Sequence, residues 1–247
     1  MSLEIHEISE AGHRILNPFT DDKLMTLAAA AHLVAGTRIL DLACGKGEML
    51  CRWAETLGVT GHGVDVSDVF LAAAGDRAEE LEVADRVSFE QGDAGVYVAE
   101  PASYDVVSCI GATWIGGGLA GTLELMRPAL RPGGLLLVGE PYWTEPPPEA
   151  AYEAVGVGPD DFTSLAGTAE RFAAAGYEVV EMVLADGDSW DRYVAAQWWT
   201  CTEWLRAHAD DPRSAAVRTF RDEGRDSHLR YQRRYFGWGV FVLRPTG

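Results

Sequence analysis

Strand-like and helix-like hydrophobic patterns alternate along the first two thirds of the chain, and this alternation constrains the fold most. Short apolar runs predict strands at Thr37–Ala43, His62–Val66, Arg86–Glu90, Tyr104–Ile110 and Leu135–Gly139. Helices are predicted at Phe19–Ala35 with Thr20 as N-cap, at Glu48–Leu57, from the N-cap Ser67 to about Ala84, and at Leu119–Leu130. Strands joined through helices pair in parallel with right-handed crossovers, so we expect a three-layer, doubly wound α/β sheet.

The last third of the chain has two further strands that enclose a long helical stretch. Pro146, Pro147 and Pro148 mark a loop after the fifth strand. Strands are predicted at Tyr177–Ala185 and Gly237–Arg244, with helices at Ser189–Ala209 and Arg213–Tyr235 between them. The first of these helices carries a stripe at helical spacing: Trp190, Tyr193, Val194, Gln197, Trp198, Cys201, Trp204 and Leu205. The stripe either docks this insertion (189–235) on the core or forms the wall of a lid over a substrate pocket.

Composition narrows the class of protein further. With 247 residues the chain suits a single domain over 1–247, and its formal charge of −18 disfavours a nucleic-acid partner. The Arg-rich stretch Arg218–Arg234 is interleaved with acidic residues, which is typical of a solvated helix face. No apolar run is long enough for a membrane span, and the N-terminus lacks the basic start of a secretory signal. Four scattered cysteines fit a reducing compartment and supply no metal framework, so we expect a cytoplasmic protein without a metal site.

The segment Ile39–Glu48 runs from a strand through a glycine turn into a helix. Gly45 and Gly47 allow the backbone to approach a ligand closely, although a turn without a ligand would use the same residues. Asp65 ends the second strand, where a carboxylate can accept hydrogen bonds from both hydroxyls of a ribose. Asp93 follows the third strand and either takes an adenine amino group or serves as an ordinary turn aspartate. Together these residues predict a nucleoside-containing cofactor.

A nicotinamide dinucleotide is the alternative ligand, because it uses the same loop and the same ribose-binding acid. Its fingerprint requires a small third residue where Leu50 stands here. Its pyrophosphate would also face Asp41 and Glu48 without a compensating arginine. A positively charged sulfonium cofactor suits this acidic loop better.

In this order, the motifs resemble those of the class I, Rossmann-like S-adenosylmethionine-dependent methyltransferases. The segments Gly111–Trp114 and Gly139–Trp143 resemble a bacterial subgroup that acts on small molecules. The glycine loop is similar to that family's D-x-G-x-G-x-G motif, with Ala43 in place of the first glycine. Asp65, Gln91–Ala94, Tyr104–Val107 and Leu130–Leu135 resemble its later motifs. The resemblance is close over residues 14–143 and loose for the terminal strands. It implies a seven-stranded sheet whose last strand is antiparallel.

Carried over position by position, the resemblance implies a set of cofactor-binding residues. Cys44, Gly45 and Gly47 would approach the methionine part, with Asp41 near its amino group. Asp65 and Val66 would contact the ribose side, Asp93 and Ala94 the adenine, and Cys109 and Ile110 the sulfonium side.

Methyl transfer is an in-line displacement at an activated carbon, so alignment supplies most of the catalysis and a general base is optional. Glu140, at the end of the fifth strand, is the candidate base, with a solvated strand-end carboxylate as the alternative. His13, Trp114, Tyr142 and Trp143 are candidate walls of the acceptor pocket, with surface exposure or plain packing as the alternative for each. We expect an enzyme that methylates a small molecule, and keep a non-catalytic cofactor-binding module as the alternative.

Overall fold

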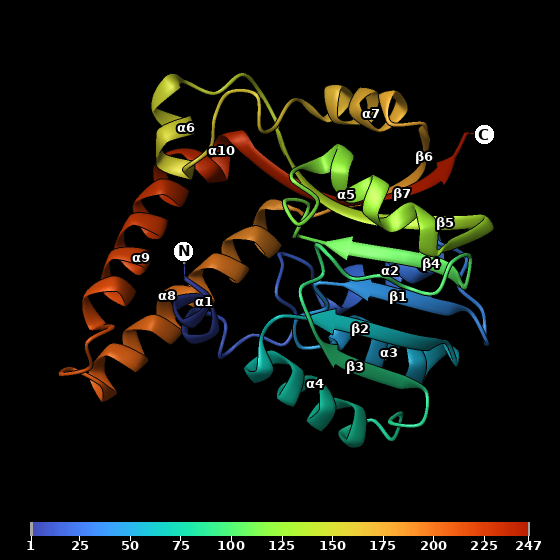
Figure 1. Cartoon of the computed structure of the whole chain (residues 1–247). Helices are drawn as coiled ribbons and strands as arrows, with labels where there is room; N and C mark the ends of the chain where they lie inside the picture. Colours follow the sequence, from blue (N-terminus) through green and yellow to red (C-terminus); the bar gives the residue numbers. More distant parts are fainter. Residues whose placement is uncertain (1, 247) are drawn as a thin grey trace.

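The computed structural model describes residues 2–246 and contains one mixed sheet covered by helices on both faces (Figure 1). The strands are β1 (Arg38–Leu42), β2 (Thr60–Asp65), β3 (Val87–Gln91), β4 (Tyr104–Ile110), β5 (Leu130–Trp143), β6 (Tyr177–Leu184) and β7 (Phe236–Pro245). Their order in the sheet is β3-β2-β1-β4-β5-β7-β6. Strands β1 to β5 pair in parallel, whereas β7 is antiparallel to both β5 and β6. This is the predicted seven-stranded sheet with an antiparallel last strand.

Helices occupy both faces of the sheet and a lobe beside it. They are α1 (Leu3–Ser9), α2 (Asp21–Ala30), α3 (Glu48–Leu57), α4 (Asp68–Glu80), α5 (Leu119–Met126), α6 (Glu149–Val155), α7 (Leu165–Ala174), α8 (Gly187–Ala207), α9 (Ser214–Ser227) and α10 (Arg233–Tyr235). A short 3₁₀ turn spans Arg127–Ala129, and a π-helical segment, His228–Gln232, separates α9 from α10. No helix within residues 2–246 combines the length and apolarity needed to cross a bilayer.

The two faces of the sheet carry separate apolar cores. On β4, Val106 packs in the core that contains Trp53 of α3, whereas its neighbour Val107 packs with Leu123 of α5 and Phe172 of α7. This division follows from the pleat, because successive side chains of a strand point to opposite faces. The same alternation determines which residues at the strand ends can reach a common site.

A third apolar cluster attaches the N-terminal helix to the helical insertion. Ile5 and Ile8 of α1 pack with Cys201 and Leu205 of α8 and with Val217 of α9. Part of the predicted stripe on α8 therefore docks the insertion on α1. Figure 1 shows α1 and α8 on the side of the sheet toward which the arrows of β1 and β4 point.

Some predicted boundaries differ from the structure. The first predicted helix ends at Ala30 instead of Ala35, and the third ends at Glu80 instead of about Ala84. Strand β5 is longer than the predicted Leu135–Gly139 at both ends: it begins at Leu130, where a turn was expected, and continues to Trp143. Helices α1, α6 and α7 were not predicted, since two of them have only 7 residues and leave a weak periodic signal.

Candidate functional site

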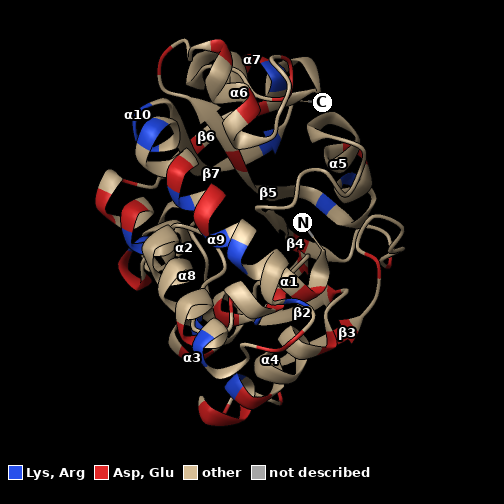
Figure 2. Cartoon of the chain, turned by 90° about the vertical axis from the view of Figure 1, so that its left-hand side faces the viewer, with Lys and Arg blue, Asp and Glu red and all other residues tan. Residues whose placement is uncertain are grey.

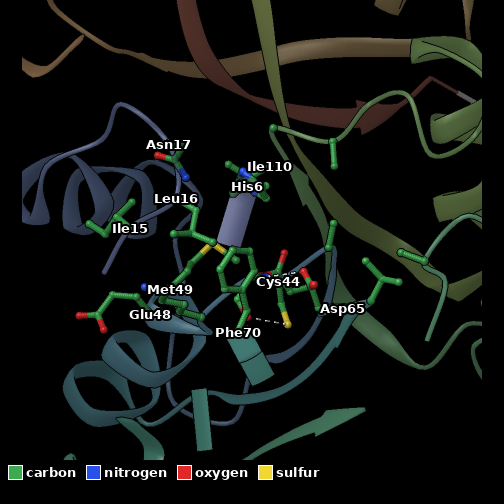
Figure 3. Close-up of a pocket in the computed structure, with 18 of the residues that line it drawn as sticks. His6, Ile15, Leu16, Asn17, Cys44, Glu48, Met49, Asp65, Phe70 and Ile110 are labelled. Carbon is green, nitrogen blue, oxygen red and sulfur yellow. Dashed lines mark hydrogen bonds between the residues drawn. The ribbon is translucent and has the colours of Figure 1, made fainter. Parts of the chain in front are cut away.

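A cavity of about 780 Å³ lies where β1, β2 and β4 end, beneath the N-terminal segment. Its volume is in the range of small-molecule and cofactor sites, and its place is the usual one in an open α/β sheet. The lining residues from the sheet side are Asp41, Ala43, Cys44, Gly45, Lys46, Glu48, Met49, Asp65, Val66, Phe70, Asp93, Ala94, Ile110, Gly111, Ala112, Trp114 and Ile115. The remaining lining residues are Ser2, Leu3, His6, Arg14, Ile15, Leu16, Asn17, Phe19, Leu24 and Tyr193. Figure 3 shows Ile15, Leu16 and Asn17 across the cavity from Asp65.

The loop after β1 and the carboxylate of Asp65 form one hydrogen-bonded unit. The Gly45 N–H donates to Asp65 Oδ2 (2.8 Å), and the Ser67 N–H donates to Asp65 Oδ1 (2.9 Å). Both oxygens are thereby oriented, while the carboxylate still lines the cavity. Asp65 is held in a fixed position with acceptor capacity left for a ligand, because an ionised carboxylate has about four lone-pair sites.

Left-handed backbone conformations shape the same loop. Gly45 and Gly47 have φ of 54° and 65°, and Ala43, which replaces a glycine of the motif, has φ of 60°. A Cβ on Gly47 would lie 2.5 Å from Phe89, so only glycine fits there without displacement. Gly47 is not among the described residues that line the cavity; it allows the turn into α3.

Asp41 is a second carboxylate at the cavity and is almost fully buried. Burial raises the pKa of Asp41 to about 7, the Ser108 hydroxyl lowers it by donating to Oδ1 (2.7 Å), and the charge of Asp65 raises it. Within residues 2–246 neither Asp41 nor Asp65 forms an ion pair, and both face one cavity. Such a site favours a positively charged ligand.

The other two carboxylates of the cavity, Glu48 and Asp93, differ in their partners. Glu48 receives two hydrogen bonds from the Arg77 guanidinium (2.8 and 3.0 Å), and Arg14 lies 3.9 Å from it. Asp93 Oδ1 accepts the Gly95 N–H (2.8 Å), so Asp93 forms an aspartate turn and also lines the cavity. The turn explanation for Asp93 is thus met by the geometry, and the contact with an adenine stays a prediction.

The ends of β4 and β5 divide their residues between the two faces. Ile110 lines the cavity, whereas its neighbour Cys109 is buried in the α5/α7 core. Glu140 has the same orientation as Val138 of that core, so it too points away from the cavity. Its Oε2 accepts the Thr113 hydroxyl (2.5 Å), and its Oε1 lies 3.8 Å from Arg171 of α7. Contrary to the sequence prediction, Cys109 and Glu140 therefore do not lie at the cavity. Successive side chains of a strand point to opposite faces, so a residue at the end of a strand can still point away from the cavity.

Burial raises the pKa of Glu140 to about 7, while the Thr113 hydroxyl and the Arg171 charge lower it. The carboxyl is 2% exposed. It is neither the solvated strand-end carboxylate considered from the sequence nor a group within the cavity.

The four candidate acceptor-pocket residues lie in different places. Trp114 lines the cavity and is 71% exposed. Tyr142 and Trp143 are buried and are not among the described lining residues; the Trp143 ring packs on Phe236 at 5.0 Å. His13 is also outside the described lining, and its Nε2 lies 3.0 Å from the Tyr193 carbonyl oxygen.

From the segment before α2, sequence reasoning named only His13 as a wall of the site and missed the residues that line the cavity. Ser2 caps α1 by accepting from the Ile5 N–H, and the i, i+3 pair Ile5 and Ile8 gives that short helix its buried apolar face. The residues after α1 then contribute Ile15, Leu16 and Phe19 to the cavity. Only the fold reveals this role, because these residues are far in sequence from the glycine loop.

The comparisons with known proteins agree with this fold and site. Residues 33–194 match the family model described as a methyltransferase domain. The uncharacterized protein YjhP of Escherichia coli (strain K12) is 50% identical over 241 residues, covering 97% of each chain. A SAM-dependent methyltransferase from Geobacter sulfurreducens, solved with S-adenosyl-L-homocysteine, superposes with a TM-score of 0.95 at 50% identity, covering 99% of this chain and 98% of that one.

A third relative, the 27-O-demethylrifamycin SV methyltransferase of Amycolatopsis mediterranei (strain S699), is 36% identical over 114 residues, or 46% of this chain and 42% of its own. The fold and site are those of a Rossmann-like, S-adenosylmethionine-dependent methyltransferase. The chain belongs to the methyltransferase domain family.

Proposed function

We propose that the cavity binds S-adenosylmethionine and that the protein transfers its methyl group to a small organic acceptor with an apolar body. One observation carries the proposal: Asp41 and Asp65, which form no ion pair within residues 2–246, line one cavity together with an apolar wall of Ile15, Leu16 and Phe19. The carboxylates suit a cation that carries a ribose. The apolar wall suits an uncharged acceptor.

The residues present fit this cofactor. In the proposal, Asp65 accepts the ribose hydroxyls, Asp93 and Ala94 hold the adenine, and Asp41 lies near the amino group. Cys44, Gly45, Val66 and Ile110 line the same cavity and complete the set. When bound, the cofactor supplies a methyl group activated by positively charged sulfur. Its positive charges would also favour ionised Asp41.

The protein's own contribution is alignment and exclusion of water. Glu140 points toward α7, so we do not assign it the role of a base. Holding two reactants in line lowers the activation barrier by up to ~7–11 kcal/mol. Proton removal by the protein is then optional. Among residues 2–246 no cluster of three His, Cys, Asp or Glu side chains could hold a metal ion.

The N-terminal segment supports an apolar acceptor. Ile15, Leu16 and Phe19 line the cavity beside Leu24 and Met49.

A polyanionic acceptor is disfavoured by the net charge of −18. Arginines of the Arg-rich stretch are paired with acids, as in Arg225–Asp222 (3.0 Å) and Arg230–Asp226 (2.6 Å). Figure 2 shows acidic segments spread over the face with α1, α8 and α9, with basic segments between them.

We further infer that residues 1–247 act as a single methyltransferase domain, since α1 and the insertion share a buried cluster. Tyr193 of the insertion lines the cavity, in keeping with a wall formed by part of the stripe. A cytoplasmic location remains a prediction, supported by four cysteines that are all free.

Calorimetric titration of the protein with S-adenosylmethionine, S-adenosylhomocysteine and NADH tests the cofactor. We expect binding of the first two and none of NADH; NADH binding alone would contradict the proposal. Transfer of radiolabelled methyl is then measured to a panel of phenols, aliphatic alcohols, aromatic amines and thiols, with RNA oligonucleotides as the contrast. Label on RNA alone would refute the acceptor class, and cofactor binding without transfer to any acceptor would favour the non-catalytic alternative.

A further inference from the structure

Lys46 lies between the two glycines of the cofactor loop, yet its side chain reaches the N-terminal segment. Its ammonium donates to the carbonyl oxygens of Glu10 (2.8 Å), Ala11 (3.2 Å) and His13 (2.7 Å). An ammonium has three N–H donors, so all three are used within the protein. Lys46 lines the cavity, but its donors are occupied by the end of α1 and not available to a ligand.

Helix α1 depends on such contacts because it has only 7 residues. An isolated helix of this length is not stable in water. Its apolar side chains pack on α8 and α9, and Glu10, just after its end, accepts hydrogen bonds from Tyr193 and Gln197 of α8 (2.6 Å each). The N-terminal segment is therefore attached to the insertion. A different set of contacts attaches it to the cofactor side.

Arg14 contacts Glu48 (3.9 Å) and Glu80 (3.3 Å) on that side, and two further polar attachments of the segment end beside Asp65. The first is Lys46, whose neighbour Gly45 donates its N–H to Asp65 Oδ2. The second is Ser67, which donates its hydroxyl to Glu7 Oε1 (2.6 Å) and its N–H to Asp65 Oδ1. The two chain segments that hold the Asp65 carboxylate are thus the same two that hold α1.

The residues after α1 form the apolar wall opposite Asp65. Leu16 is in contact distance of the glycine loop, since a Cβ built on Gly45 would lie 2.7 Å from its Cδ1. Ile15 and Phe19 lie in the same wall. A shift of the cofactor loop would therefore displace the wall, and a shift of the wall would displace the loop.

We propose that Lys46 is a positioning residue that couples cofactor binding at Asp65 to closure of the N-terminal segment, residues 2–19, over the cavity. The proposal rests on the proposed function, because it takes the cofactor to bind at Asp65. It means that the apolar wall is completed once the cofactor holds the loop, so the cofactor binds first and the acceptor second. Coupling of this kind is reciprocal: closure of the segment also tightens cofactor binding.

Amide hydrogen exchange of the full chain, with and without S-adenosylhomocysteine, tests the coupling. In the wild type, saturating S-adenosylhomocysteine should slow exchange across α1 by about tenfold, the effect of one charge-assisted contact. In Lys46→Met, which keeps a side chain of similar length without donors, most of that slowing should be lost even at saturating ligand. A merely structural lysine would change exchange equally with and without the ligand.

The chain contains only one other lysine, which supplies a matched control. Lys23 of α2 donates to the Leu184 carbonyl oxygen (2.6 Å) and lies 3.2 Å from Asp186, outside the described lining of the cavity. Lys23→Met removes comparable contacts and should retain the ligand-dependent slowing in α1. If Lys46→Met does not fold, Lys46→Gln replaces it, since its amide keeps two donors and should retain only part of the slowing.

The outcomes separate this proposal from the function on which it rests. Failure of S-adenosylhomocysteine to bind the wild type would overturn the proposed function. Binding that leaves exchange in α1 unchanged, or that slows it equally in Lys46→Met and in the wild type, would overturn the coupling alone.

Discussion

Replacing Asp65 by alanine is the most direct test of the cofactor site. The carboxylate is 8% exposed, and both its oxygens are oriented by the N–H groups of Gly45 and Ser67 at 2.8 and 2.9 Å. A hydrogen bond to a charged group contributes ~1.5–3 kcal/mol, so loss of two such bonds to a ribose should weaken binding by about 3 kcal/mol or more. This corresponds to a dissociation constant about 150-fold higher.

The same substitution has a second effect that the assay must separate from the first. Alanine leaves the two N–H groups without an acceptor, at a cost of ~1–3 kcal/mol of folding stability for each. Urea denaturation of the free protein measures this cost, and calorimetric titration with S-adenosylmethionine below the unfolding transition measures the affinity.

Asp105 offers a matched control at the opposite end of the sheet. Its Oδ2 accepts the Arg38 N–H (2.8 Å), so Asp105→Ala also removes an acceptor from a backbone donor. We expect this variant to lose stability but to bind S-adenosylmethionine as the wild type does. Wild-type affinity in Asp65→Ala, or equal losses of affinity in both variants, would refute the assignment of Asp65.

Three further predictions follow from burial and backbone geometry. Burial raises the pKa of Glu140 from 4.5 to about 7, so its contribution to stability falls as the pH rises through that window. Above neutral pH, the free energy of unfolding of Glu140→Gln, measured by urea denaturation, should therefore exceed that of the wild type by ~2–3 kcal/mol. Turnover should be unchanged. Slowed turnover at unchanged cofactor affinity would instead support Glu140 as a base. In the same urea denaturation, Gly47→Ala should lower the free energy of unfolding by ~2 kcal/mol or more, because φ is 65° and the new Cβ would lie 2.5 Å from Phe89. Gly75→Ala, on the open side of α4, should raise it by up to ~1 kcal/mol. Burial raises the pKa of Asp41 to about 7, and a bound cation favours its ionised form. At pH values below about 7, the affinity for S-adenosylmethionine should therefore increase about tenfold for each unit by which the pH is raised. Asp41→Asn should abolish this dependence, and a flat wild-type profile would contradict the role of Asp41.

The strands and the glycine loop could be predicted because their signals are local. Branched apolar runs such as Tyr104–Ile110 form strands wherever a sheet can accept them, and this strand has the predicted bounds. Ser67 caps its helix as expected, since a cap depends only on the next three residues. Gly45 and Asp65 could be assigned to one site from sequence order alone, because the carboxyl ends of parallel strands meet at one edge.

The face of a strand end was harder to predict than its position. Ile110 and Cys109 are adjacent, and only the packing of β4 decides that Ile110 lines the cavity. The same holds for Glu140, which its neighbours on β5 direct toward α7. A shift of one residue in register reverses every side chain of a strand, so the choice belongs to the whole sheet.

The sequence by itself determined the order of the strands, the glycine loop and the acidic residues that line the cavity. The tertiary structure alone decided what covers them. Lys46 is 36 residues from Glu10, and Glu10 is 183 residues from Tyr193, yet hydrogen bonds join the three residues beside the cavity. Local periodicity carries no trace of such contacts, because they form only when the sheet and the insertion bring distant segments together.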